Sequence, residues 1–113
     1  MTEKHTEPRT EKRRYARAPL DRSASFSIKG ESGARMGVAR DIAVGGMFVE
    51  TPTPARFGAD VIIHVELPGH DGPVSLPGVV RWVRDGGMGV QFGLLGAVET
   101  HIITEIGRKY AES

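Results

Sequence analysis

The feature that most constrains the fold is an alternation of apolar and polar residues that recurs in short segments along most of the chain. It is clearest at residues 61–67, where one face would carry Val61, Ile63, Val65 and Leu67. A β-strand places alternate side chains on opposite faces, so this pattern predicts a strand with one face in the core. Tight turns separate the segments and no crossover helix lies between them. The sequence therefore predicts an antiparallel sheet that closes into a barrel or nearly does.

The other predicted elements follow from the same pattern and from turn residues. In chain order they are a strand at 24–29, a turn at 30–33, a strand with Met36, Val38, Arg40 and Ile42 on one face, a bulge or tight turn at Gly45-Gly46, a strand at 47–50, a loop around Pro52 and Pro54, a turn at 68–73, and a hairpin of 74–83 with 88–92. Only the last segment changes period. Its apolar residues recur at three- and four-residue steps, which predicts an amphipathic helix over about 95–110 that covers one end of the sheet. The face of this helix would carry Leu95, Val98, Ile102, Ile106 and Tyr110.

The length and composition bound the function. A chain of 113 residues suits one domain, and no stretch reaches the roughly 18 apolar residues of a membrane helix. The N-terminus lacks the apolar segment of a secretion signal, so we expect a cytoplasmic protein. The absence of cysteine excludes thiolate metal sites, and the four histidines show no metal-ligand spacing. No serine lies in a nucleophile elbow and no acid pair is marked as a catalytic dyad, so we expect neither a metal site nor enzymatic activity.

The basic charge is concentrated near the N-terminus. Residues 1–22 carry seven Lys/Arg against four Asp/Glu, net +3, whereas the remainder carries eight against ten, net −2. Residues 1–12 are polar and offer almost nothing to bury, which predicts a flexible arm ahead of a single domain at 13–113. A surplus this small and local is weak support for DNA or RNA binding, and few aromatic residues are available for base stacking. It suits a small anion better.

A first motif, Arg13-Arg14-Tyr15-Ala16-Arg17, lies where the arm joins the first strand. The guanidinium fork matches phosphate and also the O6 and N7 acceptors of guanine, and its flat face stacks on purines. Several arginines on an arm could close over a ligand. A solvated basic tail accounts for these residues equally well when they are taken alone.

A second motif, Asp41-Ile42-Ala43-Val44-Gly45-Gly46, places an acid five residues before a glycine. A carboxylate can accept hydrogen bonds from the N1–H and the exocyclic amine of guanine, and a glycine lets a ligand approach the backbone. Turn chemistry alone also explains an aspartate before a Gly-Gly pair.

Taken together, three groups of residues resemble the PilZ family. They are Arg13-x-x-x-Arg17 followed by Ala18-Pro19-Leu20, Asp41-x-Ala43-x-x-Gly46 leading into 47–49, and the segment 87–92. The resemblance covers roughly residues 11–110. It implies an all-β fold, a six-stranded antiparallel barrel with a flexible N-terminal arm and a C-terminal helix, that binds cyclic di-GMP on its outside.

The resemblance also implies roles for particular residues. Arg13, Arg14 and Arg17 would contact the phosphates and the guanines, Asp41 a guanine edge, and Gly46 would allow close approach of the ligand. Trp82 resembles an aromatic residue that lies near the ligand in some members, and it also fits a packing role in its strand.

Ala43 departs from the family pattern, because the family has a serine at this position. Alanine neither donates nor accepts a side-chain hydrogen bond. One neutral hydrogen bond contributes about 0.5–1.5 kcal/mol, so its loss should weaken binding roughly tenfold or less. We therefore expect Ala43 to weaken the site rather than abolish it.

The sequence thus predicts a cyclic di-GMP receptor or adaptor domain without a cofactor. Ligand binding would order the arginine-rich arm, and the complex would signal to a partner protein in bacterial motility or biofilm pathways. The alternative is a PilZ-like interaction module of type IV pilus or motility systems that binds little or no cyclic di-GMP. The retained arginines favour the receptor.

Overall fold

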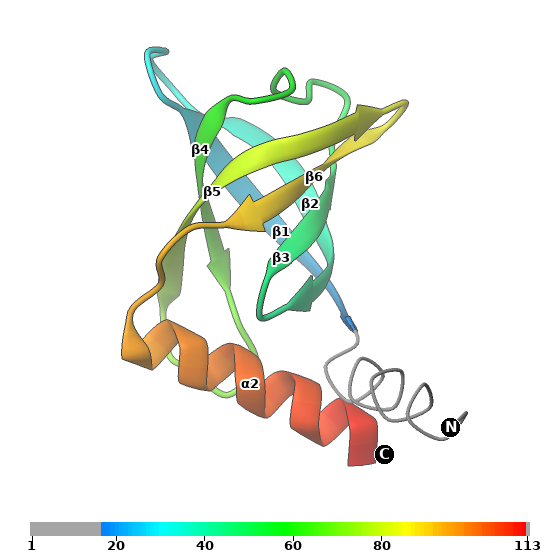
Figure 1. The fold of residues 1–113 in the computed structure, drawn as a ribbon, viewed down its shortest axis with the longest axis vertical. Helices are drawn as coiled ribbons and strands as arrows, with labels where there is room; N and C mark the ends of the chain where they lie inside the picture. The colour runs from blue at the N-terminus through cyan, green and yellow to red at the C-terminus, as the bar shows by residue number, and fades with distance from the viewer. Residues whose placement is uncertain (1–16, 113) are drawn as a thin grey trace, which may run out of the picture.

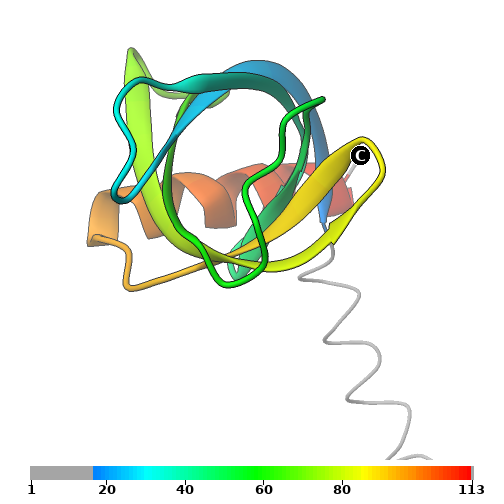
Figure 2. The same cartoon turned by 90° about the horizontal axis from the view of Figure 1, so that it is seen from above.

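The computed structural model describes residues 17–112, which form a closed barrel of six antiparallel strands with one helix across an end (Figure 1). The strands are β1 (Ala18–Ile28), β2 (Arg35–Ala43), β3 (Gly46–Glu50), β4 (Asp60–Glu66), β5 (Pro73–Arg84) and β6 (Gly87–Phe92), and the helix is α2 (Ala97–Glu112). Around the barrel the order is β1-β2-β3-β6-β5-β4, and β4 pairs with β1 to close it. Figure 2, which looks along the barrel, shows the strands as a ring. The predicted fold class is confirmed.

The alternating segments fold as expected, with one face inside the barrel. All four apolar residues of the clearest segment, from Val61 to Leu67, are buried, and Phe26 and Leu76 are completely enclosed. Burying a side chain of this size contributes about 1.5–3 kcal/mol. Because these side chains fill the interior, a ligand would have to bind at the surface of the barrel.

The predicted face of β2 is wrong, because β-bulges shift its phase. Arg40 is an extra residue relative to β3, where Ala39 pairs with Val49 and Asp41 with Phe48. Ala39 and Ile42 therefore point into the core, whereas Met36 is 64% exposed and Arg40 is also exposed. Val38, the remaining member of the predicted face, is half-buried.

A second bulge lies beside it in β1, between Pro19 and Arg22. There Asp21 adopts a φ of 52°, in the left-handed region that aspartate tolerates better than most residues. Arg40 joins the two bulges, because it donates hydrogen bonds to Asp21 Oδ1 at 2.8 Å and Glu50 Oε1 at 2.5 Å. The bond to Asp21, followed by that to Glu50, raises the pKa of Arg40 above its ordinary value. The paired bulges turn Asp41 to the outer wall.

Helix α2 crosses the end of the barrel and packs against β1 and β2 (Figure 1). Its buried residues are Ile102 and Ile103, and Ile106 packs partly against the core. The predicted face is therefore right for Ile102 and Ile106, and Leu95, which precedes the helix, also packs against the core. It is wrong for Val98 and Tyr110, which are 59% and 51% exposed. The fully buried residues of the helix lie in its middle turns, so the predicted apolar stripe is longer than the buried face. No helix within residues 17–112 is long and apolar enough to cross a membrane.

Candidate ligand-binding site

One row of paired residues runs across the outer wall on five neighbouring strands. In order it contains Pro19 of β1, Asp41 of β2, Phe48 of β3, Gly89 of β6 and Trp82 of β5. Directly paired residues of an antiparallel sheet project to the same face. The row therefore brings the second motif and Trp82 onto one surface. Three strand spacings of about 4.8 Å each separate Asp41 from Trp82.

At one end of this row Arg17 joins the two sequence motifs. Its Nη1 donates to Asp41 Oδ1 at 3.1 Å and to the carbonyl oxygen of Gly46 at 3.2 Å. The same Asp41 oxygen accepts a hydrogen bond from the backbone N–H of Phe48 at 3.0 Å, which orients the carboxylate. The side chains of Arg17 and Asp41 remain 47% and 30% exposed. An ion pair this exposed contributes only about 0–1 kcal/mol, so an incoming anion can replace Asp41 as the partner of Arg17.

The other residues predicted for the site are placed as follows. Ala43 ends β2 opposite Gly46, so its methyl group lies on the edge of the same surface. Trp82 is 40% exposed on β5. Arg13 and Arg14 lie outside the residues that the structure describes.

Gly46 has a structural reason to be glycine. A Cβ at this position would overlap the carbonyl oxygen of Val90 in β6, and backbone cannot move aside as a flexible side chain can. The resemblance to the PilZ family implies that Gly46 allows close approach of a ligand. The structure shows that close approach of β3 to β6 already requires glycine here.

Two residues that sequence reasoning missed, Phe48 and Arg84, form an aromatic platform with Trp82. The rings of Phe48 and Trp82 are stacked, with centroids 5.3 Å apart and an interplanar angle of 9°. Arg84 Cζ lies 5.0 Å from the Phe48 centroid and 4.9 Å from that of Trp82. The signal was present in the sequence as Gly87-x-Gly89, two glycines on the outer face of a strand, but only the register shows which rings cover them.

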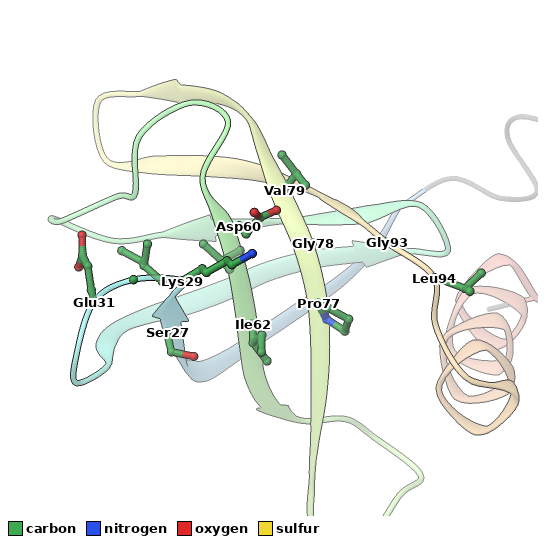
Figure 3. A pocket seen from close by; sticks show the side chains of 13 residues that line it. Ser27, Lys29, Glu31, Asp60, Ile62, Pro77, Gly78, Val79, Gly93 and Leu94 are labelled. Carbon is green, nitrogen blue, oxygen red and sulfur yellow. The ribbon is translucent and has the colours of Figure 1, made fainter.

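A hollow in the described surface lies elsewhere, over the end of β1 and over β4, β5 and the segment after β6 (Figure 3). Its volume is about 640 Å³, and its lining includes Lys29, Asp60, Ile62, Pro77 and Leu94. None of the predicted site residues that the structure describes lines it. Within residues 17–112 no group of three or more His, Cys, Asp or Glu side chains could hold a metal ion.

A closed six-stranded barrel with a helix across one end, and with its charged and aromatic groups displayed on the outer wall, defines a small β-barrel binding domain. The model of the PilZ domain family matches residues 11–107, and the chain belongs to this family. PilZ domains are regulatory binding modules, and the family includes receptors and adaptors for cyclic di-GMP.

Solved structures share the fold at low sequence identity. The PilZ domain of CeSA from a cellulose-synthesizing bacterium superposes with a TM-score of 0.64 at 19% identity, covering 86% of this chain and 96% of that one. The inhibitor of motility of Bacillus subtilis superposes with a TM-score of 0.71 at 14% identity, covering 88% of this chain and 51% of that one. A comparison with curated proteins gave no match.

Proposed function

We propose that this chain is a cyclic di-GMP receptor domain that passes the signal to a partner protein in the cytoplasm. The observation that carries the proposal is the contact of Arg17 with both Asp41 and Gly46. Residues of two motifs separated by more than twenty positions meet on one surface, and each supplies a group suited to this ligand. Membership of the PilZ family makes cyclic di-GMP the natural candidate.

Binding would exchange one set of partners for another. Arg17 would leave Asp41 and donate to a ligand phosphate, a charge-assisted bond of planar geometry. Asp41, still held by the N–H of Phe48, would accept hydrogen bonds from a guanine edge. Each group would therefore keep a hydrogen-bond partner in both states.

The proposal also covers Arg13 and Arg14, which lie outside the described residues, and Ala43, which has no polar side-chain group. Arg13 and Arg14 would add donors from the arm, which would order on the ligand. Ala43 can supply no hydrogen bond, and its methyl group would only border the ligand. The ordered arm and the ligand would then form the surface that a partner, such as a component of the motility or pilus machinery, recognises.

Isothermal titration of the full chain with cyclic di-GMP, repeated on Arg17→Ala and Asp41→Ala, tests the proposal. A hydrogen bond to a charged group contributes about 1.5–3 kcal/mol, so each variant should bind roughly 10- to 150-fold more weakly. Arg22→Ala is the matched control, because it removes an exposed arginine of β1 that makes no contact with Asp41 or Gly46. We expect its affinity to match that of the unmodified chain.

The alternative is a PilZ-like interaction module of pilus or motility systems, which the absence of the serine hydroxyl at Ala43 favours. No heat from the unmodified chain at ligand concentrations on the order of 100 µM, equivalent to about −5.5 kcal/mol, would support that alternative and reject the receptor.

A further inference from the structure

The two rings of the aromatic platform lie against two glycines of β6. A Cβ at Gly87 would overlap the ring of Phe48, and a Cβ at Gly89 would overlap the ring of Trp82. Each ring therefore lies directly against the backbone of β6. Met88, between the two glycines, points inward and is fully buried. Because backbone covers the inner side of the two rings, the outer side is left for Arg84.

Arg84 differs from the other arginines of this surface in its partners. Arg17 and Arg40 bond to carboxylates, and Arg81 donates to Gln91 Oε1 at 2.7 Å. Among residues 17–112, no hydrogen-bond acceptor or carboxylate engages Arg84. Its guanidinium instead contacts the rings of Phe48 and Trp82. The guanidinium thus lies over the two rings, and within residues 17–112 its N–H donors have no acceptor.

The acidic residue closest in register does not compete for these donors. Arg84 pairs with Gly87 of β6, which in turn pairs with Glu50 of β3. Glu50 is already bonded to Arg40, which also bonds Asp21. No carboxylate of residues 17–112 bonds Arg84, so its donors are available to a negative partner from outside the described chain.

We propose that Arg84 is a ligand-contact residue, whose guanidinium edge donates to a phosphate of the bound nucleotide. The inference rests on the proposed function and adds to it a contact that belongs to the barrel rather than to the arm. Stacking on Phe48 and Trp82 fixes the side chain before the ligand arrives, so less conformational freedom is lost on binding. The fork of donors matches the oxygens of a phosphate. Phe48 connects this contact to Asp41, because its ring carries Arg84 and its backbone N–H holds the Asp41 carboxylate.

The test is a titration of the full chain with cyclic di-GMP for the unmodified protein, Arg84→Ala, Arg84→Lys and Arg17→Ala. Loss of one charge-assisted contact should weaken binding about tenfold or more in Arg84→Ala. Arg84→Lys keeps the charge but lacks the planar fork, so its affinity should lie between those of the unmodified protein and Arg84→Ala. The dissociation constant of Arg84→Ala should also depend less steeply on salt concentration than that of the unmodified chain.

A fluorescence measurement reads the platform directly, because Trp82 is the only tryptophan of the chain. Adding cyclic di-GMP should change the emission of the unmodified protein, because a phosphate bound to Arg84 would lie close to the Trp82 ring. The same addition should produce a smaller change in Arg84→Ala, at ligand concentrations that saturate both proteins. Circular dichroism of each variant establishes that the barrel is intact.

The outcomes separate the two proposals. If Arg17→Ala weakens binding while Arg84→Ala binds as tightly as the unmodified chain, the receptor stands and the role of Arg84 is overturned. In that case Arg84 only covers the rings, and its removal should lower the midpoint of thermal unfolding without altering the affinity. If the unmodified chain does not bind, the proposed function fails and the inference about Arg84 fails with it.

Discussion

Two parts of the outer wall differ in what they offer a ligand. Over β4 and β5 the surface is hollowed, with a volume of about 640 Å³, and the charged residues of its lining are Lys29, Glu31 and Asp60, net −1. Over β2, β3, β6 and β5 we find oriented groups instead, with the Arg17–Asp41 pair at one end and the aromatic platform at the other. The hollow has space without the right charge for an anion, whereas the site has donors at defined positions.

The two surfaces also differ in charge. We call the outer surface of β2, β3, β6 and β5, which carries the candidate site, the site wall. Arg17, Arg81 and Arg84 stand on it against Asp41, net +2, while Glu50 is bonded to Arg40 at its border. Cyclic di-GMP is a dianion with flat bases, so it is suited to guanidinium groups and rings on an open wall. We therefore expect the position of donors, rather than the volume of a hollow, to determine where such a ligand would bind on this barrel.

The largest effect is expected for a substitution at Gly46, which should lower the free energy of unfolding. In Gly46→Ala the added Cβ would overlap the Val90 carbonyl, and β3 must separate from β6 to make room. Overpacking of this kind costs about 1–3 kcal/mol of the free energy of unfolding, which urea denaturation measures. The matched change on the other wall is Gly93→Ala, whose Cβ would meet the Pro77 carbonyl at an ordinary 3.8 Å. Equal stabilities of the two variants would show that β3 and β6 do not need glycine here.

Sequence reasoning found the groups of the site that depend on local spacing. Arg17, Asp41 and Gly46 stand in short motifs, and the alternation at 61–67 gave the barrel its core face. It failed at β2, because the bulges at Arg40 and in β1 invert the phase without any signal in the local alternation. A bulge depends on how two strands pair, and a single strand carries too little of that information.

The aromatic platform shows the same limit on a larger scale. Phe48, Trp82 and Arg84 come from β3 and β5 and meet across β6, so their contact depends on the register of three strands. A further bulge at Arg81 sets the pairing of Trp82 with Gly89. Each residue taken alone fits an ordinary strand position, and only the assembled wall shows that the two rings and the guanidinium form one cluster.

A smaller effect is expected at Ala43, where the site wall lacks a polar group. Ala43→Ser would add a hydroxyl at the edge of the surface, opposite Gly46. A neutral hydrogen bond contributes about 0.5–1.5 kcal/mol, so cyclic di-GMP should bind up to roughly tenfold more tightly in isothermal titration. Ala111→Ser, an exposed change in α2, is the control. An unchanged affinity in Ala43→Ser would mean that the ligand makes no use of a hydroxyl at this position.

The smallest effect is expected in the hollow, and it is the one that tests the comparison most directly. Lys29→Ala removes a cation from the lining of the hollow, just as Arg17→Ala removes one from the site wall. Lys29 follows the last residue of β1, whereas Arg17 precedes the first, so the two cations lie at opposite ends of this strand. Salt in the solvent screens the charge of Lys29 over that distance. The dissociation constant for cyclic di-GMP should therefore change by less than about twofold. If Lys29→Ala instead weakens binding as much as Arg17→Ala does, the hollow takes part in binding, and volume as well as oriented charge determines where this barrel holds its ligand.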